Sequence, residues 1–332
     1  MKISMLQKVK QLLGSRKKIV ITTHQRPDGD AMGSSLGLYH YLTQLGHNVT
    51  VIAPTDFAAF LKWMPSVGTV MIGPFYQEKA KRFFQQTDII FCLDFSHLSR
   101  VGEFDESVRD SPAFKIMIDH HIDPQDFANF QYWDEHASST CELIYRFICD
   151  LGDRSMINQK VATCLYTGIM TDTGSFRFPA TTPAVHRVVA DLMETGIETH
   201  KIHEAIYDTN SENRIRFLGH CLSNCLTVLP EKRAAYISIS KEVAQQFKIE
   251  TGDAENIVNY ALSIKGIDFA TMMLENPDII RLSFRSRGEF GVNTFAANFD
   301  GGGHFYASGG RSRLSLVETE QKFLTLLNEL RP

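Results

Sequence analysis

In the first half of the chain, short apolar runs alternate with longer segments of helical periodicity. Residues 19–21, 88–93 and 114–118 are typical of buried strands, whereas residues 31–45 and 158–170 repeat apolar side chains at helical spacing. Consecutive parallel strands need a crossover between them, so this alternation favours a parallel sheet. We therefore predict an α/β fold that begins with a mostly parallel sheet covered by helices on both faces.

The length of the chain predicts more than one domain. It has 332 residues, 43% of them hydrophobic, which is enough for two cores. We place a catalytic domain at residues 1–210 and a charged helical connector at residues 211–230. A smaller α/β domain follows at residues 231–332, with a hairpin expected within 269–286 and a helix at 317–330.

Charge and cysteine content limit the partners and the compartment. The net charge is −4, so a broad basic surface for long duplex nucleic acid is not expected. The six cysteines form no C-x-x-C pair, which is typical of reduced thiols. Residues 1–18 lack the continuous apolar segment of a signal peptide, and no run of about 18 apolar residues follows them. We expect a soluble, cytoplasmic protein with no membrane partner.

Histidine and aspartate residues stand directly after the predicted strands. His24, Asp94 and Asp119 each follow the carboxyl end of one of them. Ligands of open α/β sheets bind in the crevice outside those ends. Three separate segments therefore bring candidate ligands to one edge of one sheet, which chance placement rarely does.

The turn after the first strand carries His24, Asp28 and Asp30. Pro27 and Gly29 in the same segment favour a loop over a helix. Aspartates two residues apart reach a common neighbourhood. Carboxylates together with imidazole suit Mn²⁺, Mg²⁺ or a related divalent ion. The alternative interpretation is an ordinary polar turn whose aspartates cap the next helix.

The segment Asp119-His120-His121 is a stronger indication of a metal site. Adjacent histidines on an extended segment point in different directions, so one can bind metal while the other faces substrate. The aspartate beside them can orient an imidazole through its second nitrogen. Asp172 follows a predicted helix and is a weaker candidate. The alternative interpretation of the histidine segment is a polar loop after a strand. For Asp94 and Asp172, the alternative is a helix cap or the solvated end of an element.

Four of these carboxylates suffice for two metal ions. Divalent ions about 4 Å apart repel each other, and several carboxylates are needed to offset that repulsion. Asp28, Asp30, Asp94 and Asp172 supply them. Such a pair of ions can activate water and hold phosphoryl oxygens, so the sequence predicts a metal-dependent phosphoesterase.

The four motifs together resemble the DHH phosphoesterase superfamily. The pattern H-x-x-P-D-x-D-x-x-G-S is complete from His24 to Ser34, and Asp94 is followed by Ser96 and by Arg100-Val-Gly. The Asp-His-His segment and the run Asp-Thr-Gly-Ser-Phe-Arg at residues 172–177 complete the set. The match covers most of the chain, and the order and spacing of the four motifs make it highly specific.

The last third of the chain is similar to the DHHA1 substrate-binding domain. Its mark is a glycine run followed by histidine, which here is Gly301, Gly302, Gly303 and His304. Two departures stand out. Asp300 takes the place of the first of four glycines in many relatives, and residues 307–310 read Ala-Ser-Gly-Gly where Ala-Ala-Gly is commoner.

The resemblance implies roles for the residues of the first domain. One metal ion would be held by His24, Asp28 and Asp94, with Asp94 shared by both ions. The second would be held by the remaining ligands, Asp30, Asp94, His120 and Asp172. Asp119 would support the site, His121 would contact the scissile phosphate, and a hydroxide between the ions would attack phosphorus. Two divalent ions are implied, Mn²⁺ first and Mg²⁺ as the alternative.

Candidate substrate-binding residues lie mainly in the second domain. Backbone N–H groups of a glycine turn can bind an anion, which makes Gly301, Gly302 and Gly303 candidates together with His304. An arginine fork suits a second phosphate. The candidates are Arg100 in the first domain and Arg285 with Ser286 on a predicted strand of the second. The alternative is a glycine turn at a helix start with surface arginines.

Compact length and this pairing of domains resemble the NrnA-type subgroup. Its members degrade short oligoribonucleotides and dephosphorylate 3′-phosphoadenosine 5′-phosphate, so short single-stranded RNA and 3′,5′-bisphosphonucleotides are the implied substrates. A phosphodiesterase for linear or cyclic dinucleotides is one alternative, and a non-catalytic nucleotide-binding protein is another. The resemblance leaves a homodimer open.

Overall fold

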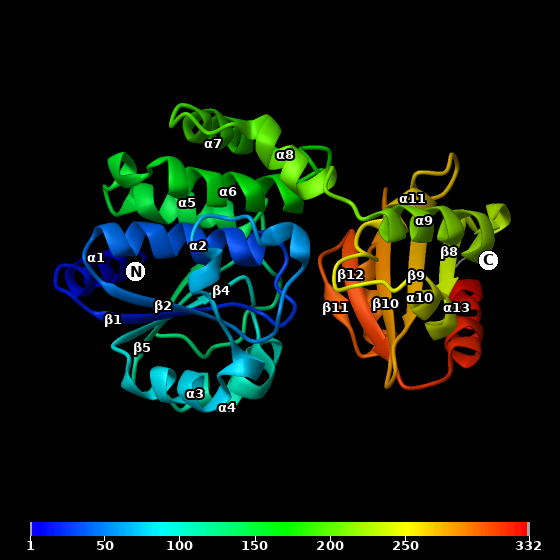
Figure 1. The fold of residues 1–332 in the computed structure, drawn as a ribbon, viewed down its shortest axis with the longest axis horizontal. Coiled ribbons are helices and arrows are strands. Elements are labelled where there is room, and N and C mark those ends of the chain that lie inside the picture. The colour runs from blue at the N-terminus through cyan, green and yellow to red at the C-terminus, as the bar shows by residue number, and fades with distance from the viewer. Residues whose placement is uncertain (1, 331–332) are drawn as a thin grey trace. The chain divides into compact units, whose positions relative to one another are not determined.

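The computed structural model describes residues 2–330 and divides into two units between Thr209 and Asn210. The ribbon in Figure 1 shows both units, and each is described by itself below. Within residues 2–330, every helix is too short or too polar to span a lipid bilayer.

The first unit is built on a six-stranded sheet in which every strand is parallel to its neighbours. The strand order is β3-β2-β1-β4-β5-β6. The strands are β1 (Lys18–Thr22), β2 (Asn48–Ala53), β3 (Met71–Ile72), β4 (Ile89–Leu93), β5 (Phe114–Asp119) and β6 (Phe130–Trp133). This is the order of a doubly wound fold, in which the strand order reverses between β1 and β4. In such folds, ligands bind outside the carboxyl ends of the strands at this point.

Helices cover both faces of this sheet, as the sequence predicts. Alternate side chains of β1 enter different cores, with Ile19 and Ile21 on one face and Val20 on the other. One core includes α1 (Lys2–Leu13), α2 (Gly29–Gln44), α5 (Thr140–Asp150), α6 (Gln159–Asp172), α7 (Pro183–Met193) and α8 (Thr199–Tyr207). The other lies beneath α3 (Gln77–Gln86) and α4 (Asp105–Arg109), on the opposite side of the sheet in Figure 1.

Side-chain caps fix where the helices nearest the sheet edge begin. Asp28 caps α2 by accepting from the backbone N–H groups of Asp30 and Ala31. Ser139 caps α5 by accepting from the N–H of Glu142 at 3.0 Å. These caps are local in sequence, and they set the direction in which each helix leaves the sheet.

Close packing between α2 and α6 depends on glycines. A Cβ atom at Gly33 would lie 2.6 Å from the carbonyl oxygen of Cys164, and one at Gly168 would lie 2.8 Å from Oδ1 of Asp30. Real side chains do not approach so closely, so the two helices can pack at this distance only without side chains at the contact. The approach brings the end of α6 near the start of α2.

The second unit has a mixed six-stranded sheet in the order β11-β12-β10-β9-β8-β7. β8 and β9 are parallel, and the other neighbours are antiparallel. The strands are β7 (Leu226–Leu229), β8 (Ala234–Ile239), β9 (Phe269–Glu275), β10 (Ile280–Ser286), β11 (Gly302–Gly303) and β12 (Ala307–Ser312). The hairpin predicted within residues 269–286 is the β9–β10 pair.

Helices also cover both faces of the second sheet. One core packs under α9 (Glu212–His220), α10 (Lys241–Gln246) and α11 (Ile257–Leu262), and the other under α12 (Val292–Ala296) and α13 (Leu316–Leu330). Residues 211–230, which the sequence suggests as a connector, form α9, a π-helical turn and β7. Phe217 and Cys221 of this segment are fully buried in the core of the second unit, so the segment is an integral part of that unit.

Candidate active site

His24 and Asp94 lie at the point where the strand order of the first sheet reverses. His24 follows β1 and Asp94 follows β4, and these strands are neighbours in the sheet. Nε2 of His24 lies 3.4 Å from Oδ2 of Asp94 and 3.9 Å from Oδ2 of Asp28. The fold therefore gathers these three predicted residues into one group.

Asp30, His120 and Asp172 form a second group. Nε2 of His120 lies 3.4 Å from Oδ2 of Asp172 and 3.8 Å from Oδ2 of Asp30. The same nitrogen is 3.6 Å from Oδ1 of Asp94. Asp94 thus directs one carboxylate oxygen towards each group, because its Oδ2 faces His24 and its Oδ1 faces His120.

Both histidines present the same ring nitrogen to the carboxylates. Nδ1 of His24 lies 2.8 Å from the carbonyl oxygen of Gln25, and Nδ1 of His120 lies 3.2 Å from that of Ala137. A carbonyl can only accept, so Nδ1 carries the proton and Nε2 has the lone pair when the ring is neutral. This arrangement is the usual one for a histidine that ligates a metal ion.

The amino-terminal end of α5 holds two of the acids, and the sequence reasoning missed this contact. The N–H groups of Thr140 and Cys141 donate to Asp30 at 2.6 and 2.9 Å. The hydroxyl of Thr140 donates to Oδ1 of Asp94 at 2.9 Å. The Ser139 cap signals a helix start, but no local pattern shows which carboxylates will meet that start.

Contacts between loops bring the sequence motifs together. Asp28 uses Oδ1 to cap α2, which leaves Oδ2 towards His24. A Cβ atom at Gly29 would lie 2.3 Å from the hydroxyl of Thr171, so only glycine allows the first loop to pack against the end of α6 beside Asp172. The first and fourth motifs are therefore in direct contact.

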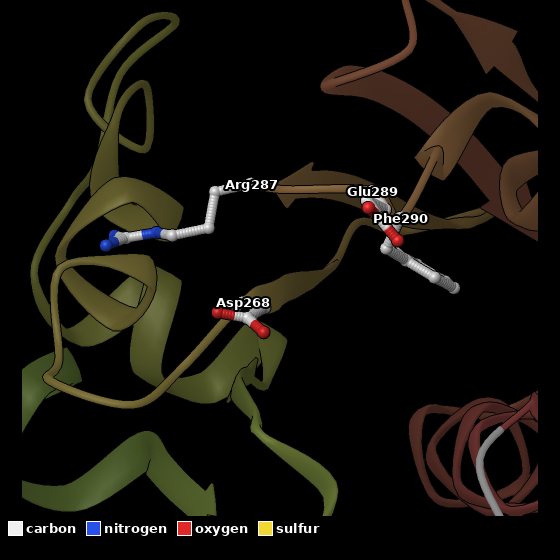
Figure 2. Close-up of a pocket in the computed structure, with 4 residues that line it drawn as sticks. All are labelled: Asp268, Arg287, Glu289 and Phe290. Carbon is white, nitrogen blue, oxygen red and sulfur yellow. The ribbon is translucent and has the colours of Figure 1, made fainter.

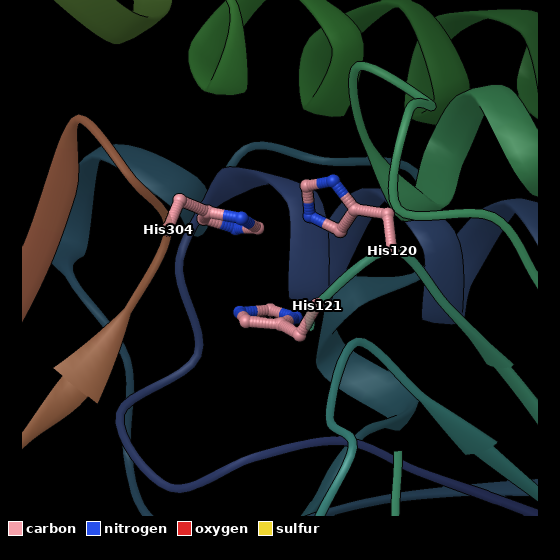
Figure 3. Close-up of side chains that lie close together, drawn as sticks. All are labelled: His120, His121 and His304. Carbon is pink, nitrogen blue, oxygen red and sulfur yellow. The ribbon is translucent and has the colours of Figure 1, made fainter. Parts of the chain in front are cut away.

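The His121 ring lies beside that of His120, as Figure 3 shows, and Asp119 holds it. Their planes are 74° apart, and Nδ1 of His121 lies 2.8 Å from Oδ1 of Asp119. Asp119 is completely buried, so its hydrogen bond fixes the orientation of the imidazole. His304, which is drawn in the same figure, belongs to the second unit and is described below.

Burial and mutual charge shift the pKa values of these groups. Burial, followed by the charges of Asp94 and Asp172, raises the pKa of Asp30 well above its ordinary value. Burial also opposes ionisation of Asp94, but hydrogen bonds from His120 and His24 hold its pKa well below its ordinary value. Burial lowers the pKa of each histidine, yet the carboxylates outweigh it and the net pKa shift is upward.

The donor atoms fit divalent cations. His24, Asp28 and Asp94 offer ligand atoms within 4.8 Å of one another, and so do the members of the second group. Carboxylate oxygens with imidazole nitrogens are suitable ligands for Mn²⁺. Nearby carboxylates repel each other in a buried site unless positive charge is added. In addition, the buried Oδ2 atom of Asp119 has no hydrogen-bond partner among the described residues.

Arg100 lies on the rim of the cluster. Its side chain is exposed, and its positive charge partly opposes the upward shift in the pKa of His24. The carbonyl oxygen of Arg100 accepts from the N–H of Gln25 at 2.8 Å, which ties its segment to the loop of the first motif. The guanidinium is therefore near enough to the acids to influence an anion bound there.

The predicted substrate-binding residues of the second unit lie on neighbouring strands. Arg285 of β10 pairs in register with Ala307 of β12, and Gly302 and Gly303 form β11 beside β12. The glycine run is therefore one strand of a hairpin with His304 at the turn, and the helix-start alternative is wrong. The N–H of Gly301 is already bonded to the carbonyl of Ala296 at 3.1 Å.

Ser286 differs from its neighbours. Its side chain is buried, and its hydroxyl donates to the carbonyl oxygen of Phe290 at 2.6 Å. Its N–H donates to the carbonyl of Tyr306 at 3.1 Å. The first bond holds the loop that follows β10, and the second joins β10 to the β11–β12 hairpin. Ser286 therefore acts as a structural residue, and we do not retain it as a substrate contact.

The second unit also has an open pocket of about 380 Å³, shown in Figure 2. It is lined by Asp268, Arg287, Glu289 and Phe290. Asp268 accepts from Nε of Arg233 at 2.6 Å, and the guanidinium of Arg287 donates to the carbonyl of Leu262. These charged groups bond within the unit, and the predicted site residues are not among those that line the pocket.

Two family models match the chain, one in each unit. The model described as the DHH family, N-terminal domain, matches residues 18–169, and the DHHA1 domain matches residues 234–330. A relative named bifunctional oligoribonuclease and PAP phosphatase NrnA, from Bacillus subtilis, is 28% identical over 292 residues. The match covers 88% of this chain and 88% of that protein.

Solved structures agree with these matches. An exopolyphosphatase-related protein from Bacteroides fragilis is 40% identical, with a TM-score of 0.93 and coverage of 98% of this chain and 96% of that one. RecJ from Thermus thermophilus, solved with Mn²⁺, is 10% identical with a TM-score of 0.52. That match covers 99% of this chain and 54% of RecJ, and it shows a shared fold. The chain belongs to the DHH family of phosphoesterases and carries a DHHA1 domain in its second unit.

Proposed function

We propose that this protein hydrolyses short oligoribonucleotides to mononucleotides and 3′-phosphoadenosine 5′-phosphate to AMP, with two divalent cations in the first unit. The observation that carries the proposal is the arrangement of two ligand groups on either side of one carboxylate, Asp94. The substrates are supported by the name of the Bacillus subtilis relative, which matches most of the chain.

The two groups divide the ligands between the cations. We assign His24, Asp28 and Asp94 to one ion. Asp30, His120 and Asp172 hold the other, and Asp94 is shared. When bound, such a pair supplies an activated water and positive charge for the phosphoryl oxygens. Mn²⁺ is our first choice because the set mixes carboxylates with imidazoles, and Mg²⁺ is the alternative.

The surrounding residues keep these ligands in position. The two backbone N–H groups at the start of α5 hold both oxygens of Asp30, and the Thr140 hydroxyl holds Asp94. Fixed donors of this kind avoid reorganisation when charge develops in the reaction. The carbonyls of Gln25 and Ala137 keep the Nε2 atoms of the two histidines turned towards the acids.

His121 and Arg100 are assigned to the substrate phosphate. Because Asp119 holds Nδ1 of His121, we assign the other ring nitrogen, Nε2, to a phosphoryl oxygen. Arg100 offers a planar fork that suits a phosphate group. In the second unit, Arg285, His304 and the exposed Gly302 are assigned to the remaining anionic groups of the substrate.

The test is turnover of a substrate panel by the full chain with Mn²⁺ or Mg²⁺. The panel contains a diribonucleotide, a five-residue RNA, a long RNA duplex, 3′-phosphoadenosine 5′-phosphate and a cyclic dinucleotide. We expect the short RNAs and the bisphosphonucleotide to be hydrolysed, and a chelator to stop the reaction. Hydrolysis of the cyclic dinucleotide alone would favour the dinucleotide phosphodiesterase, and binding without hydrolysis of any substrate would favour the non-catalytic alternative.

A further inference from the structure

Two aromatic side chains lie exposed at the turn of the β11–β12 hairpin. Phe305 is 45% exposed and Tyr306 is 37% exposed. Their ring centroids are 4.8 Å apart and their planes are 84° apart. Parallel stacked rings would cover each other, whereas this near-perpendicular arrangement keeps ring faces open to solvent. Exposed aromatic surface is unfavourable in water, so a pair held in this way is a candidate binding surface.

The backbone beneath this aromatic pair is firmly held. The carbonyl oxygen of Phe305 accepts from the N–H of Val292 at 2.7 Å, and that of Tyr306 accepts from the N–H of Ser286 at 3.1 Å. His304 and Ala307 exchange two backbone hydrogen bonds across the turn, at 2.9 and 3.2 Å. The hairpin turn is therefore tied both to itself and to the segment after β10.

Gly291 creates the space for the Phe305 ring. A Cβ atom at Gly291 would lie 2.6 Å from Cε2 of Phe305, closer than real side chains approach. The ring therefore packs against bare backbone on one side while nearly half of its surface stays exposed. A ring supported in this way loses little conformational entropy when a flat ligand stacks on it.

The residues next to the pair indicate the ligand. His304 directly precedes Phe305, and Arg285 pairs in register with Ala307, which directly follows Tyr306. Exposed rings beside a cationic fork and an imidazole combine the two features that recognise a nucleotide, a flat base and an anionic phosphate. We propose that Phe305 and Tyr306 form a stacking site for a nucleobase of the substrate.

This inference rests on the proposed function and specifies how the substrate is chosen. Every base has a π-face, so stacking selects for the presence of a base and tolerates any sequence. The site would favour single-stranded ends, because bases in a duplex are already stacked on each other and cannot reach the rings. Selectivity for short single-stranded substrates would then come in part from this hairpin.

The experiment compares a substrate with a base against one without. We would measure KM and kcat of the full chain with 3′-phosphoadenosine 5′-phosphate and with ribose 3,5-bisphosphate, which lacks the base. Phe305→Ala and Tyr306→Ala should each raise KM for the first substrate by about tenfold and leave KM for the second unchanged. Phe305→Trp should retain tight binding, and Phe305→Leu should resemble the alanine variant. Tyr260→Ala is the control, because Tyr260 is an exposed aromatic of the same unit, on α11, at 49% exposure.

A binding measurement separates this inference from the proposed activity. A dinucleotide containing 2-aminopurine loses fluorescence when its base stacks, so the full chain should quench it and Phe305→Ala should not. The stacking site would be overturned if the variants raised KM equally for both bisphosphates. It would also be overturned if KM and the quenching were unchanged in the variants. Absence of hydrolysis by the unaltered protein, with quenching intact, would instead contradict the proposed function alone.

Discussion

Asp94 occupies a backbone conformation that few residues adopt. Its φ angle is +65°, its side chain is buried, and it directs one oxygen towards each ligand group. Aspartate and asparagine tolerate this left-handed region better than most residues because their short side chains bond locally. The position therefore selects for a residue that is both small and anionic, and the two requirements can be separated by substitution.

Asp94→Asn tests the anionic requirement while keeping the backbone. We expect the fold to persist, bound metal to fall, and the hydrolysis rate to drop by at least about a hundredfold, because both ligand groups lose a shared charge. Metal content by elemental analysis and turnover of a diribonucleotide check the result. Asp123→Asn is the matched control, since Asp123 also has a positive φ, of +52°, but is exposed. Full metal content in the Asp94 variant would contradict the ligand assignment.

The raised pKa values of His24 and His120 predict how stability responds to pH. A histidine whose pKa is raised above 6.5 by folding stabilises the folded state below pH 6.5. That contribution is lost as the pH rises through the raised pKa. The raised pKa of Asp30 acts in the same direction, since its ionisation is unfavourable in the folded protein. The metal-free protein should therefore lose stability as the pH rises above about 6.5.

Added Mn²⁺ should reverse this trend. Metal ions bind the deprotonated ligands and displace their protons, so affinity rises with pH. We expect the increase in melting temperature caused by Mn²⁺ to be larger at about pH 8 than at about pH 6. Thermal unfolding at both pH values, with Mn²⁺ and with chelator, measures this difference. An increase that is the same at both values would show that protons and metal do not compete for the cluster.

At the scale of elements, the contact between α2 and α6 places ligands from distant parts of the chain. Asp30 lies in the first turn of α2, and Asp172 is the last residue of α6. Gly168 faces this contact, and a Cβ atom there would lie 2.2 Å from Sγ of Cys141 and 2.8 Å from Oδ1 of Asp30. The helix contact and the ligand position are therefore coupled through one glycine.

Gly168→Ala should disturb both the contact between α2 and α6 and the position of Asp30. We expect a loss of about 1–3 kcal/mol in the free energy of unfolding, because the added methyl group overpacks a buried contact. We also expect weaker Mn²⁺ binding, because Asp30 must move. Urea denaturation and metal titration measure the two effects. Gly219→Ala on α9 is the control, since nothing lies within 4 Å of a Cβ atom there, and it should stabilise by up to about 1 kcal/mol. If the Gly168 variant lost stability but kept its Mn²⁺ affinity, the helix contact would not determine the position of Asp30.

Local patterns predicted the main elements of the first unit. The apolar runs at 88–93 and 114–118 became β4 and β5, and the helical patterns at 31–45 and 158–170 became α2 and α6. The short strands β3 and β11 were not predicted, because two residues carry no periodicity. The segment 211–230 was interpreted as a connector because it begins with charged residues, Glu212, Arg214 and Arg216, in a helical pattern. Phe217 and Cys221 are buried against a sheet whose strands come later in the chain, so the segment's own residues could not predict this burial.

The same limit applies to the candidate site. The acids and histidines could be listed because they follow strand ends in a recognisable order. The groups that hold them could not be predicted, since the Thr140 contacts to Asp30 and Asp94 span 110 and 46 residues. Ser286 shows the opposite error, because its place beside Arg285 in sequence suggested a ligand contact. Alternation along β10 turns the Ser286 side chain into the protein, where it bonds to Phe290.

For the whole molecule, the two units carry different chemistry. All assigned metal ligands lie before Thr209, whereas the glycine–histidine hairpin and Arg285 lie after it. The DHH and DHHA1 matches divide the chain in the same way. If the units have separate tasks, one substitution should affect metal binding and another should affect substrate binding, and neither should affect both.

His304→Ala tests this separation from the side of the second unit. We expect KM for 3′-phosphoadenosine 5′-phosphate to rise by about ten- to a hundredfold, because a hydrogen bond to a charged group is lost. Metal content should equal that of the unaltered protein, in contrast to Asp94→Asn. His200→Ala is a suitable control, since this exposed histidine lies on α8 of the first unit. A fall in metal content in the His304 variant, together with the rise in KM, would mean that the second unit takes part in holding the cations and that the two tasks are shared.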